Sequence, residues 1–429
     1  MGVWSMSTTE HVHHCVSEER LRDDITTNAE YGAIPTDRGH GRTVLAGTEA
    51  NRRAREYFVD RLEAAGLDVR IDAVGNIVGR WVPDGASPTT PAVACGSHLD
   101  SVPEGGIFDG VLGVYSALEA VRALQETDRD LARPVEVVCF TEEEGGRFSN
   151  GVLGSSVASG KRTVDEALGL EDDDGVTLDA ALTDIGFRGA ERVDASEWDS
   201  WLELHVEQGE RLQDAGAAVG IVSAITGTIR CAVEIDGEAD HSGCTAMADR
   251  TDALAAASEL ILEVEDATND VVAENDDTVV GTVGKCDVSP NAINVVPGAV
   301  ELGIDVRDVR YAPMETIVER VRECLADLEA ERGVETTFER PYDISPSEMS
   351  ERCTAALERA VATVDVPSLS LHSGAGHDTM HIANVTETGM LFAPSRGGFS
   401  HSPREWTDWS SCATATRVLA AGLANLAHD

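Results

Sequence analysis

The chain reads Gly96-Ser-His-Leu-Asp-Ser-Val-Pro-Glu-Gly-Gly-Ile-Phe-Asp-Gly110 directly after the apolar run Ala92–Cys95. The apolar run predicts a short buried strand, and the polar stretch predicts that this strand delivers metal ligands. His98 can bind a divalent ion through a ring nitrogen, and Asp109 has two oxygens that can each hold a different ion. Asp100 suits a supporting role, because a metal-bound histidine usually donates its other N–H to a carboxylate.

A second acidic cluster, Glu142-Glu143-Glu144, follows the strand-like run Pro134–Phe140. Three adjacent carboxylates repel one another, and a solvated acidic loop is one interpretation. The functional interpretation is that one glutamate binds a metal while its neighbour, with a pKa raised by crowding, acts as general base and acid.

Two further clusters each contain a histidine among polar residues. His205 stands in the alternating segment Trp201–Gly209, and His401 stands in the glycine-rich segment Gly397–Glu405 near the C-terminus. A single histidine of this kind is more often structural than catalytic. Four such clusters in one chain indicate a shared site.

Eight motifs occur in a characteristic order: GSHLDSVPEGGIFDGVLGV, TEEEGGRF, ELHVEQG, DGEADHSG, PNAINVVPG, DVRD, SGAGHDTM and SRGGFSHSPREWT. In this order they resemble the di-zinc amidohydrolases that include N-carbamoyl-L-amino-acid hydrolases, allantoate amidohydrolases and beta-ureidopropionases. These enzymes are relatives of the aminoacylases and of carboxypeptidase G. The resemblance extends from about Gly41 to the C-terminus.

The resemblance implies two divalent metal ions, with zinc expected and manganese, cobalt or nickel as alternatives. It makes His98 and His205 ligands of one ion, Glu144 and His401 ligands of the other, and Asp109 the bridge between them. It also implies three catalytic residues besides the ligands, namely the general base Glu143, Asp100 and His241.

The resemblance further implies a substrate-binding set: Gln208, His241, Asn294, Arg307 and Gly398. His241 would stabilise the oxyanion, and in this family such a histidine can act across a dimer. Arg307 would bind an acid group of the substrate, since its planar guanidinium matches a carboxylate. The alternatives are that Arg307 belongs to a salt-bridged strand end and that Asn294 is a turn residue. His377-Asp378 is interpreted as loop architecture near the pocket and not as a ligand.

We expect an α/β fold with a mixed sheet flanked by helices in a catalytic domain, interrupted by a smaller inserted α+β domain. The catalytic domain spans 1–220 and 341–429, because His401 must rejoin a site built mainly by residues 98–205. The insert spans 221–340 and, by the resemblance, is a lid that also dimerises, so a homodimer is expected.

Local patterns predict several elements outside the motifs. Helical spacing of apolar residues predicts a helix from Thr48 that ends at Gly66, followed by a strand over Asp68–Asp72. The acidic segment Leu170–Ser196 is expected to be a surface excursion. The tract His11–His14 is interpreted as a disordered tail and not as a metal site.

The charge balance is extreme, with 77 acidic against 33 basic residues and a net charge of −44. Such a field excludes nucleic acid and anionic membranes as partners and leaves small molecules. Because the acids are spread along the chain, adaptation to high salt is the favoured explanation. The nine cysteines include no Cys-x-x-Cys pair, and no apolar run reaches membrane-span length, so a cytoplasmic, soluble protein without a disulfide framework is expected.

The expected activity is metal-dependent hydrolysis of a linear amide C–N bond. The favoured substrate is an N-carbamoyl-L-amino acid, which would yield the amino acid, ammonia and carbon dioxide. Allantoate amidohydrolase is the first alternative, and an aminoacylase or dipeptidase acting on N-acyl compounds is the second. An inactive metal-binding relative is disfavoured, because every expected ligand and Glu143 are present.

Overall fold

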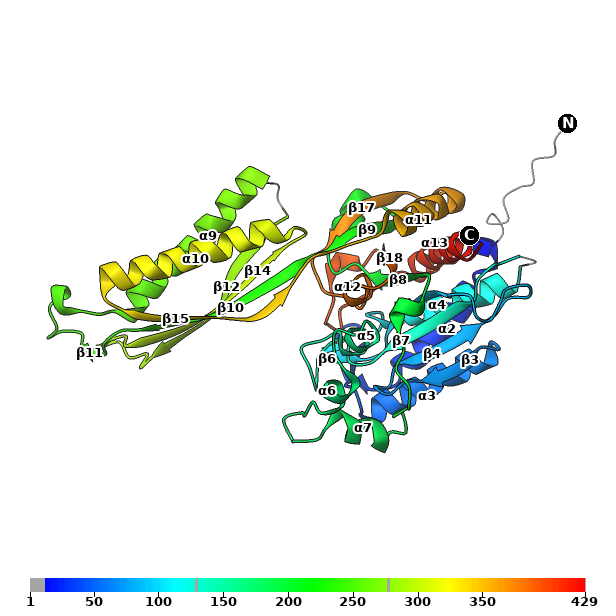
Figure 1. Ribbon diagram of the computed structural model, residues 1–429, viewed down its shortest axis with the longest axis horizontal. Coiled ribbons are helices and arrows are strands. Elements are labelled where there is room, and N and C mark those ends of the chain that lie inside the picture. Colours follow the sequence, from blue (N-terminus) through cyan, green and yellow to red (C-terminus); the bar gives the residue numbers. More distant parts are fainter. Residues whose placement is uncertain (1–11, 128–129, 276–277, 429) are drawn as a thin grey trace. The chain divides into compact units, whose positions relative to one another are not determined.

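The computed structural model describes residues 12–127, 130–275 and 278–428, and its chain divides into two compact units (Figure 1). Unit 1 comprises residues 1–223, 349–371 and 375–429, and unit 2 comprises 224–348 and 372–374. The predicted α/β class is confirmed, because both units combine a sheet with helices. The units divide after residues 223 and 348, compared with predicted divisions after 220 and 340.

A mixed sheet forms the middle of unit 1, in the strand order β9-β18-β8-β5-β7-β4-β3, with β17 pairing β9 as well. Its four central strands β18, β8, β5 and β7 are parallel, so their carboxyl ends share one edge. The strands are β3 (Asp68–Ile71), β4 (Ile77–Trp81), β5 (Val93–His98), β7 (Val135–Phe140), β8 (Ser200–Val206), β9 (Val219–Ile225), β17 (Ser368–Ser373) and β18 (Glu387–Ala393).

Both faces of this sheet are covered, which explains why β5, β7 and β8 are buried along their whole length. On β8, Leu202 and Leu204 belong to the core packed by α4 and α13, whereas Trp201 belongs to the opposite core with α12. The helices of unit 1 are α1 (Val12–Cys15), α2 (Glu18–Ala29), α3 (Glu49–Ala64), α4 (Val111–Gln125), α5 (Leu153–Ala158), α6 (Val164–Leu168), α7 (Leu178–Asp184), α8 (Arg211–Ala215), α11 (Glu351–Val364), α12 (Thr379–Ile382) and α13 (Trp409–His428). Short 3-10 helices span Ala195–Glu197 and Arg396–Gly398, and a small sheet joins β1 (Ala33–Ile34), β2 (Gly41–Val44) and β6 (Ser101–Gly105).

The local predictions for unit 1 hold in part. Helix α3 starts after Thr48, whose side chain accepts a hydrogen bond from the Asn51 N–H, and Gly66 follows its end with a positive φ of 76°. The segment 170–196 is not a pure surface excursion, because Leu178, Leu182 and neighbouring apolar side chains pack into the main core.

The tract His11–His14, which was predicted to be a disordered tail, is helical in its described part. Residues Val12–Cys15 form helix α1, and the Val12 side chain is fully buried. His13 is buried as well, and His11 lies outside the described residues. The prediction had assumed that a polar histidine tract would stay in water, whereas apolar Val12 and Val16 attach it to the core.

Unit 2 is a four-stranded antiparallel sheet in the order β12-β14-β10-β15, with α9 and α10 packed on one face (Figure 1). Alternate residues of β10 are buried and exposed, as expected for a sheet covered on one side. The elements are β10 (Gly227–Asp236), β11 (Asp240–His241), a 3-10 helix (Met247–Asp249), α9 (Ala253–Asn275), β12 (Val280–Ser289), β13 (Val295–Val296), β14 (Ala299–Asp308), α10 (Tyr311–Arg332), β15 (Glu335–Ile344) and β16 (Ser347–Glu348).

The chain leaves unit 1 and returns to it at neighbouring points. Met349 donates its backbone N–H to the Ser223 carbonyl at 3.0 Å. Directly beyond these residues, β16 pairs antiparallel with the end of β9, with Ser347 opposite Ile225.

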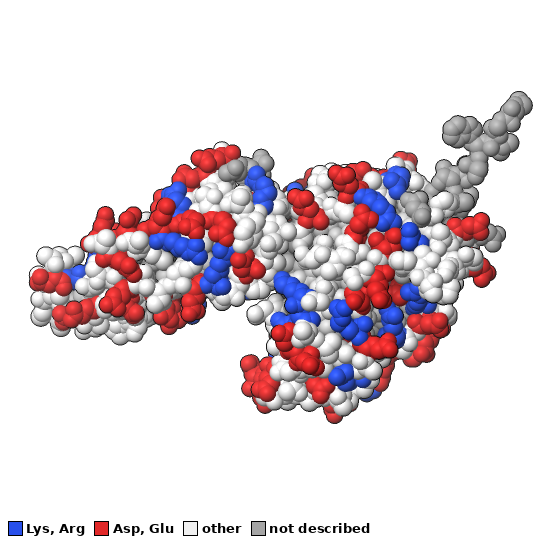
Figure 2. All heavy atoms as spheres, in the orientation of Figure 1, with Lys and Arg blue, Asp and Glu red and all other residues white. Residues whose placement is uncertain are grey.

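Acidic side chains are spread over both units on the face shown in Figure 2, with arginines between them. Unit 2 carries 28 acidic and 9 basic residues, a net charge of −19 over 128 residues, which leaves −25 over the 301 residues of unit 1. Among the described residues, none of the helices is long and apolar enough to cross a membrane.

Candidate metal centre

Five of the predicted site residues come together at the carboxyl edge of the unit 1 sheet. His98 is the last residue of β5, His205 lies near the end of β8, and Glu144 follows β7. Asp109 directly precedes Gly110 at the start of α4, and His401 lies in the loop before α13. The parallel order of β8, β5 and β7 explains why residues far apart in sequence meet here.

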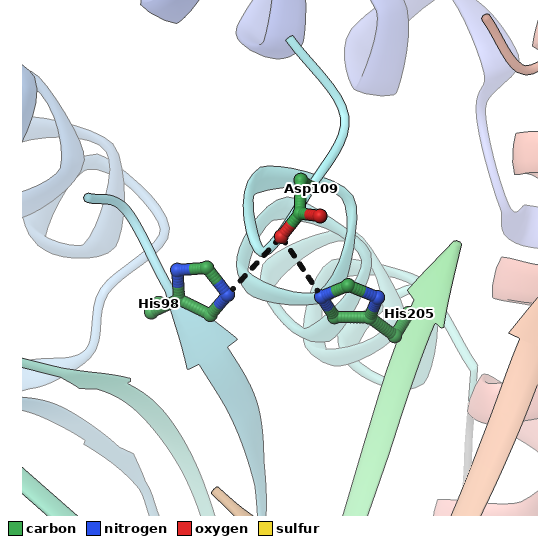
Figure 3. Close-up of side chains that lie close together, drawn as sticks. All are labelled: His98, Asp109 and His205. Carbon is green, nitrogen blue, oxygen red and sulfur yellow. Dashed lines mark ion pairs between the residues drawn. The ribbon is translucent and has the colours of Figure 1, made fainter. Parts of the chain in front are cut away.

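One group consists of His98, Asp109 and His205, all of them buried (Figure 3). The Asp109 Oδ1 atom lies 3.2 Å from His205 Nε2 and 3.5 Å from His98 Nε2. Both imidazole rings therefore direct their Nε2 atoms towards Asp109 Oδ1.

The second group uses the other oxygen of the same carboxylate. Asp109 Oδ2 lies 3.8 Å from His401 Nε2, and this nitrogen lies 3.1 Å from Glu144 Oε2. One ligand atom from each of Asp109, Glu144 and His401 falls within 4.8 Å of the others. Asp109 thus faces one candidate cation site with each oxygen.

The hydrogen bonds of the histidines fit metal binding through Nε2. His98 Nδ1 lies 3.2 Å from the Asp100 carbonyl, and His205 Nδ1 lies 3.0 Å from the Val206 carbonyl. A proton on each Nδ1 satisfies these contacts and leaves a lone pair on Nε2. His98 Nε2 and Glu144 Oε1 are buried without a hydrogen-bond partner, as expected of atoms that bind an ion.

Asp100 connects the two groups in a way that the prediction had only partly described. Its carbonyl, and not its carboxylate, makes the close contact with His98, since Oδ1 lies 3.7 Å from Nδ1. Its Oδ2 accepts a hydrogen bond from the Glu144 N–H at 3.0 Å. Asp100 therefore orients His98 with its backbone and the Glu144 loop with its side chain.

The three adjacent glutamates have three different environments. Glu142 is buried and its Oε1 accepts the backbone N–H groups of Arg147 and Phe148, so it shapes the loop. Glu143 Oε2 lies 3.6 Å from His98 Nε2, and burial raises the pKa of Glu143 well above its usual range. Glu144 faces His401.

Gln208 and Gly398, two predicted substrate residues, also lie at this edge. Gln208 donates from Nε2 to Asp109 Oδ2 at 3.2 Å and to the Ser400 hydroxyl at 3.0 Å. Gly398 has a positive φ of 63°, and a side chain there would meet the Gly209 backbone at 2.8 Å. A glycine therefore allows the His401 loop to approach the loop that follows β8.

His241, Asn294 and Arg307 belong to unit 2. His241 is exposed, and its Nδ1 accepts the N–H groups of Gly243 and Cys244. Asn294 is also exposed and lies in a turn, as the alternative interpretation predicted, and its backbone carbonyl accepts the N–H of Ser242.

Arg307 has the local partner that the alternative interpretation predicted. Its Nε and Nη2 bind the Asp305 carboxylate at 2.7 and 3.3 Å, and its Nη1 donates to the Gly374 carbonyl at 3.0 Å. The side chain is 31% exposed, so part of the guanidinium still faces solvent.

Sequence reasoning assigned no role to Ser400 or Glu405, and it interpreted His377 only as loop architecture near the pocket. Ser400 donates its hydroxyl to Asp109 Oδ2 at 2.7 Å. The His377 ring meets the His205 ring edge-on, with centroids 4.6 Å apart. Glu405 accepts the Asp109 N–H. Ser400 and Glu405 flank His401 in the motif SHSPRE, which was the only available signal.

The model of the peptidase family M20/M25/M40 matches residues 94–425. An N-carbamoyl-L-amino-acid amidohydrolase of Paenarthrobacter aurescens is 36% identical over 405 residues, covering 94% of this chain and 96% of the relative. An allantoate amidohydrolase of Bacillus subtilis (strain 168) is 33% identical over 413 residues, covering 95% of this chain and 97% of the relative.

A solved amidase of the hydantoinase/carbamoylase family from Burkholderia multivorans superposes with a TM-score of 0.88 at 31% identity, covering 96% of this chain and 98% of that one. The fold, the grouped ligands and these matches define the class: the chain belongs to the peptidase family M20/M25/M40. Within that family, the chain is similar to amidohydrolases that act on C–N bonds of linear amides.

Proposed function

We propose that this protein hydrolyses N-carbamoyl-L-amino acids to the amino acid, ammonia and carbon dioxide, using two divalent metal ions. The observation that carries the proposal is the Asp109 carboxylate, whose two oxygens face two separate groups of histidine and carboxylate side chains. His98 and His205 would hold one ion, and Glu144 and His401 the other. Zinc is the expected metal, although these ligands also suit manganese, cobalt and nickel.

When bound, two cations lower the pKa of a water molecule towards neutrality and polarise the scissile carbonyl. The protein's own contribution is proton transfer at Glu143, whose side chain is 9% exposed and whose Oε2 lies 3.6 Å from His98 Nε2. Its carboxylate takes a proton from the attacking water and returns it to the leaving nitrogen. A carboxyl group with a raised pKa is suited to holding that proton between the two steps.

Substrate binding is assigned to groups of both units. Gln208 and Gly398 line the metal edge of unit 1, and His241, Asn294 and Arg307 are the contributions of unit 2. Arg307 would bind the substrate carboxylate and His241 the developing oxyanion. Unit 2 accordingly serves as lid and dimerisation domain, and the active form is a homodimer.

Ammonia release in about molar salt, with added zinc or manganese, tests the proposal. N-carbamoyl-L-amino acids, allantoate and N-acetyl amino acids are compared, and the N-acetyl compounds need a free-amine assay because they release no ammonia. Turnover of the carbamoyl compounds alone supports the proposal. Turnover of N-acetyl compounds alone would make the protein an aminoacylase, and no turnover with two metals bound would make it an inactive relative.

Allantoate hydrolysis is the second candidate, because the Bacillus subtilis relative of that name matches nearly the whole chain. The same ligands and the same general base serve this reaction, so only the substrate preference separates the two. A higher kcat/KM for allantoate than for every carbamoyl amino acid would favour this candidate.

Mixed dimers test whether His241 acts across the subunit interface. His241→Ala and Glu143→Gln chains are each expected to be nearly inactive, and mixing them creates sites with both residues intact if the two come from different chains. Recovered partial activity supports sharing. No recovery in a verified mixed dimer places His241 in the site of its own chain.

A further inference from the structure

Glu405 is a buried carboxylate that the proposed mechanism does not use. It stands four residues after His401, and its side chain is completely shielded from solvent. Its Oε1 accepts the backbone N–H groups of Phe108 and Asp109 at 2.8 and 3.0 Å. Phe108 and Asp109 lie almost 300 residues before Glu405 in the sequence, so the contact joins two distant loops.

The neighbouring backbone is shaped around this carboxylate. A side chain at Gly106 would place its Cβ 2.3 Å from Glu405 Oε1, so only glycine leaves room for the contact. The loop of Glu405 is itself closed, because the Glu405 N–H binds the Ser402 carbonyl and the Arg396 N–H binds the Trp406 carbonyl.

The His401 loop therefore holds Asp109 from two sides. Ser400 donates to the Asp109 carboxylate at 2.7 Å, whereas Glu405 binds the backbone N–H of the same residue. Two contacts of this kind fix both the position of the residue and the direction of its side chain. That direction decides which oxygen faces His205 and which faces His401.

A buried arginine contacts the segment that carries His98. Arg42 is fully buried and donates from Nη2 to the Leu99 carbonyl at 2.7 Å, next to His98. Burial lowers the pKa of Arg42, and Glu405 is the first of the charged groups that oppose this effect.

We infer that Glu405 is a positioning residue of the metal centre, which sets the affinity for both ions by fixing the backbone at Asp109. The inference rests on the proposed function only in requiring that metals bind to these ligands. Because Asp109 belongs to both groups, its displacement affects both binding steps. Loss of such an outer contact typically weakens metal binding about 10- to 100-fold.

The test is a calorimetric titration of zinc into metal-free protein, without substrate. Glu405→Ala is expected to weaken both binding steps about 10- to 100-fold. Glu405→Gln keeps an oxygen that accepts the two N–H groups, so its affinities are expected to stay within about fivefold of the wild type. Gly106→Ala should weaken binding as Glu405→Ala does, because its methyl group displaces the carboxylate.

Glu119→Ala is the matched control. Glu119 is also a fully buried carboxylate that accepts a distant backbone N–H, that of Ser17 at 2.7 Å, and its ion pairs are with Arg20 and Arg122 and not with the candidate ligands. This variant should melt at a lower temperature and bind zinc as the wild type does. If it lost affinity equally, general destabilisation would explain the Glu405 result and the inference would fail.

Unchanged zinc affinity in folded Glu405→Ala would overturn the inference, as would equal losses in the Ala and Gln variants. If Glu405→Ala does not fold, the Gly106→Ala titration decides in the same way. Normal two-step zinc binding in the wild type, together with no hydrolysis of any tested substrate, would refute the proposed function and leave this inference standing.

Discussion

The two units hold their candidate site residues in opposite ways. In unit 1, His98, Asp109 and His205 are at most 3% exposed, and hydrogen bonds to backbone carbonyls or to side chains fix their direction. In unit 2, His241 and Asn294 are exposed, and Arg307 keeps a solvent-facing part. The difference teaches that His98, Asp109 and His205 are preorganised by packing, whereas the substrate-binding candidates of unit 2 remain accessible to solvent.

The units also differ in charge density. Unit 2 carries −19 over 128 residues, and unit 1 carries −25 over 301. Self-repulsion per residue is therefore greater in the smaller unit, which also has the smaller core. Four predictions test how far this contrast between the units extends.

The largest effect is expected in unit 1 from Glu143→Gln. Glutamine cannot take a proton from water, so kcat should fall about 10²- to 10⁴-fold while both metals stay bound. Steady-state kinetics and metal analysis check this. Glu142→Gln is the matched neighbour and should keep most of the turnover, because its role is to accept two backbone N–H groups. Metal loss in Glu143→Gln would show that the base is misassigned.

A smaller effect is expected in unit 2 from Arg307→Ala. Loss of a charged hydrogen bond to the substrate carboxylate should raise KM about 10- to 100-fold, with little change in metal content. Arg320→Ala removes an arginine of α10 that pairs with Glu263 of α9, and this control should leave KM unchanged. If Arg307 only closes the strand end with Asp305, its loss would lower the melting temperature and leave KM as it was.

A third, smaller effect is expected from salt, because the two units should differ in the salt concentration that they need to stay folded. Lowering the ionic strength from molar to millimolar removes screening, so unit 2 should loosen at a higher salt concentration than unit 1. All six tryptophans belong to unit 1, so their fluorescence reports that unit, and hydrogen exchange of α9 and α10 reports the other. A melting temperature that is indifferent to salt in both units would refute the proposed adaptation to high salt.

The smallest effect concerns a core histidine of unit 1. Burial, helped by the positive charges of Lys161 and Arg162, lowers the pKa of His381 to about 3. Below pH 6.5 the unfolded chain takes up a proton that the folded chain refuses, so stability decreases as pH falls. Between pH 7 and 5 the wild type should lose about 2 kcal/mol more than His381→Asn. Denaturant unfolding followed by tryptophan fluorescence measures the difference, and parallel pH slopes would contradict it.

The sequence allowed the ligand-bearing strands to be predicted because their signals are local. An apolar run followed by a histidine or carboxylate marks the end of β5, β7 or β8, and the parallel sheet then brings these ends together. The α/β class and the motif-based family followed from the same runs. The start of helix α3 at Thr48 was predictable for the same reason, since a capping residue and its helix are adjacent.

The contacts that hold the ligands were not predictable in this way. Glu405 binds backbone N–H groups almost 300 residues away, and any residue type other than proline offers such a group. Leu178 and Leu182 were hidden by the acidic residues around them, because composition averages over a segment whose apolar side chains share one face. For Arg307, the sequence left two possibilities open: a salt bridge within its own strand or a contact with a substrate carboxylate. Residue spacing alone does not select between Asp305 and a substrate.

The hydrogen bond between Met349 and Ser223 brings the two ends of the unit 2 segment together. Residues 224–348 leave and re-enter through points that a hairpin turn of about two residues could join. All five ligand candidates lie outside this segment, and only residues 372–374 of unit 2 would remain with them. Unit 2 is therefore an insertion in the topological sense, because joining residues 223 and 349 would leave all five ligand candidates on one connected chain.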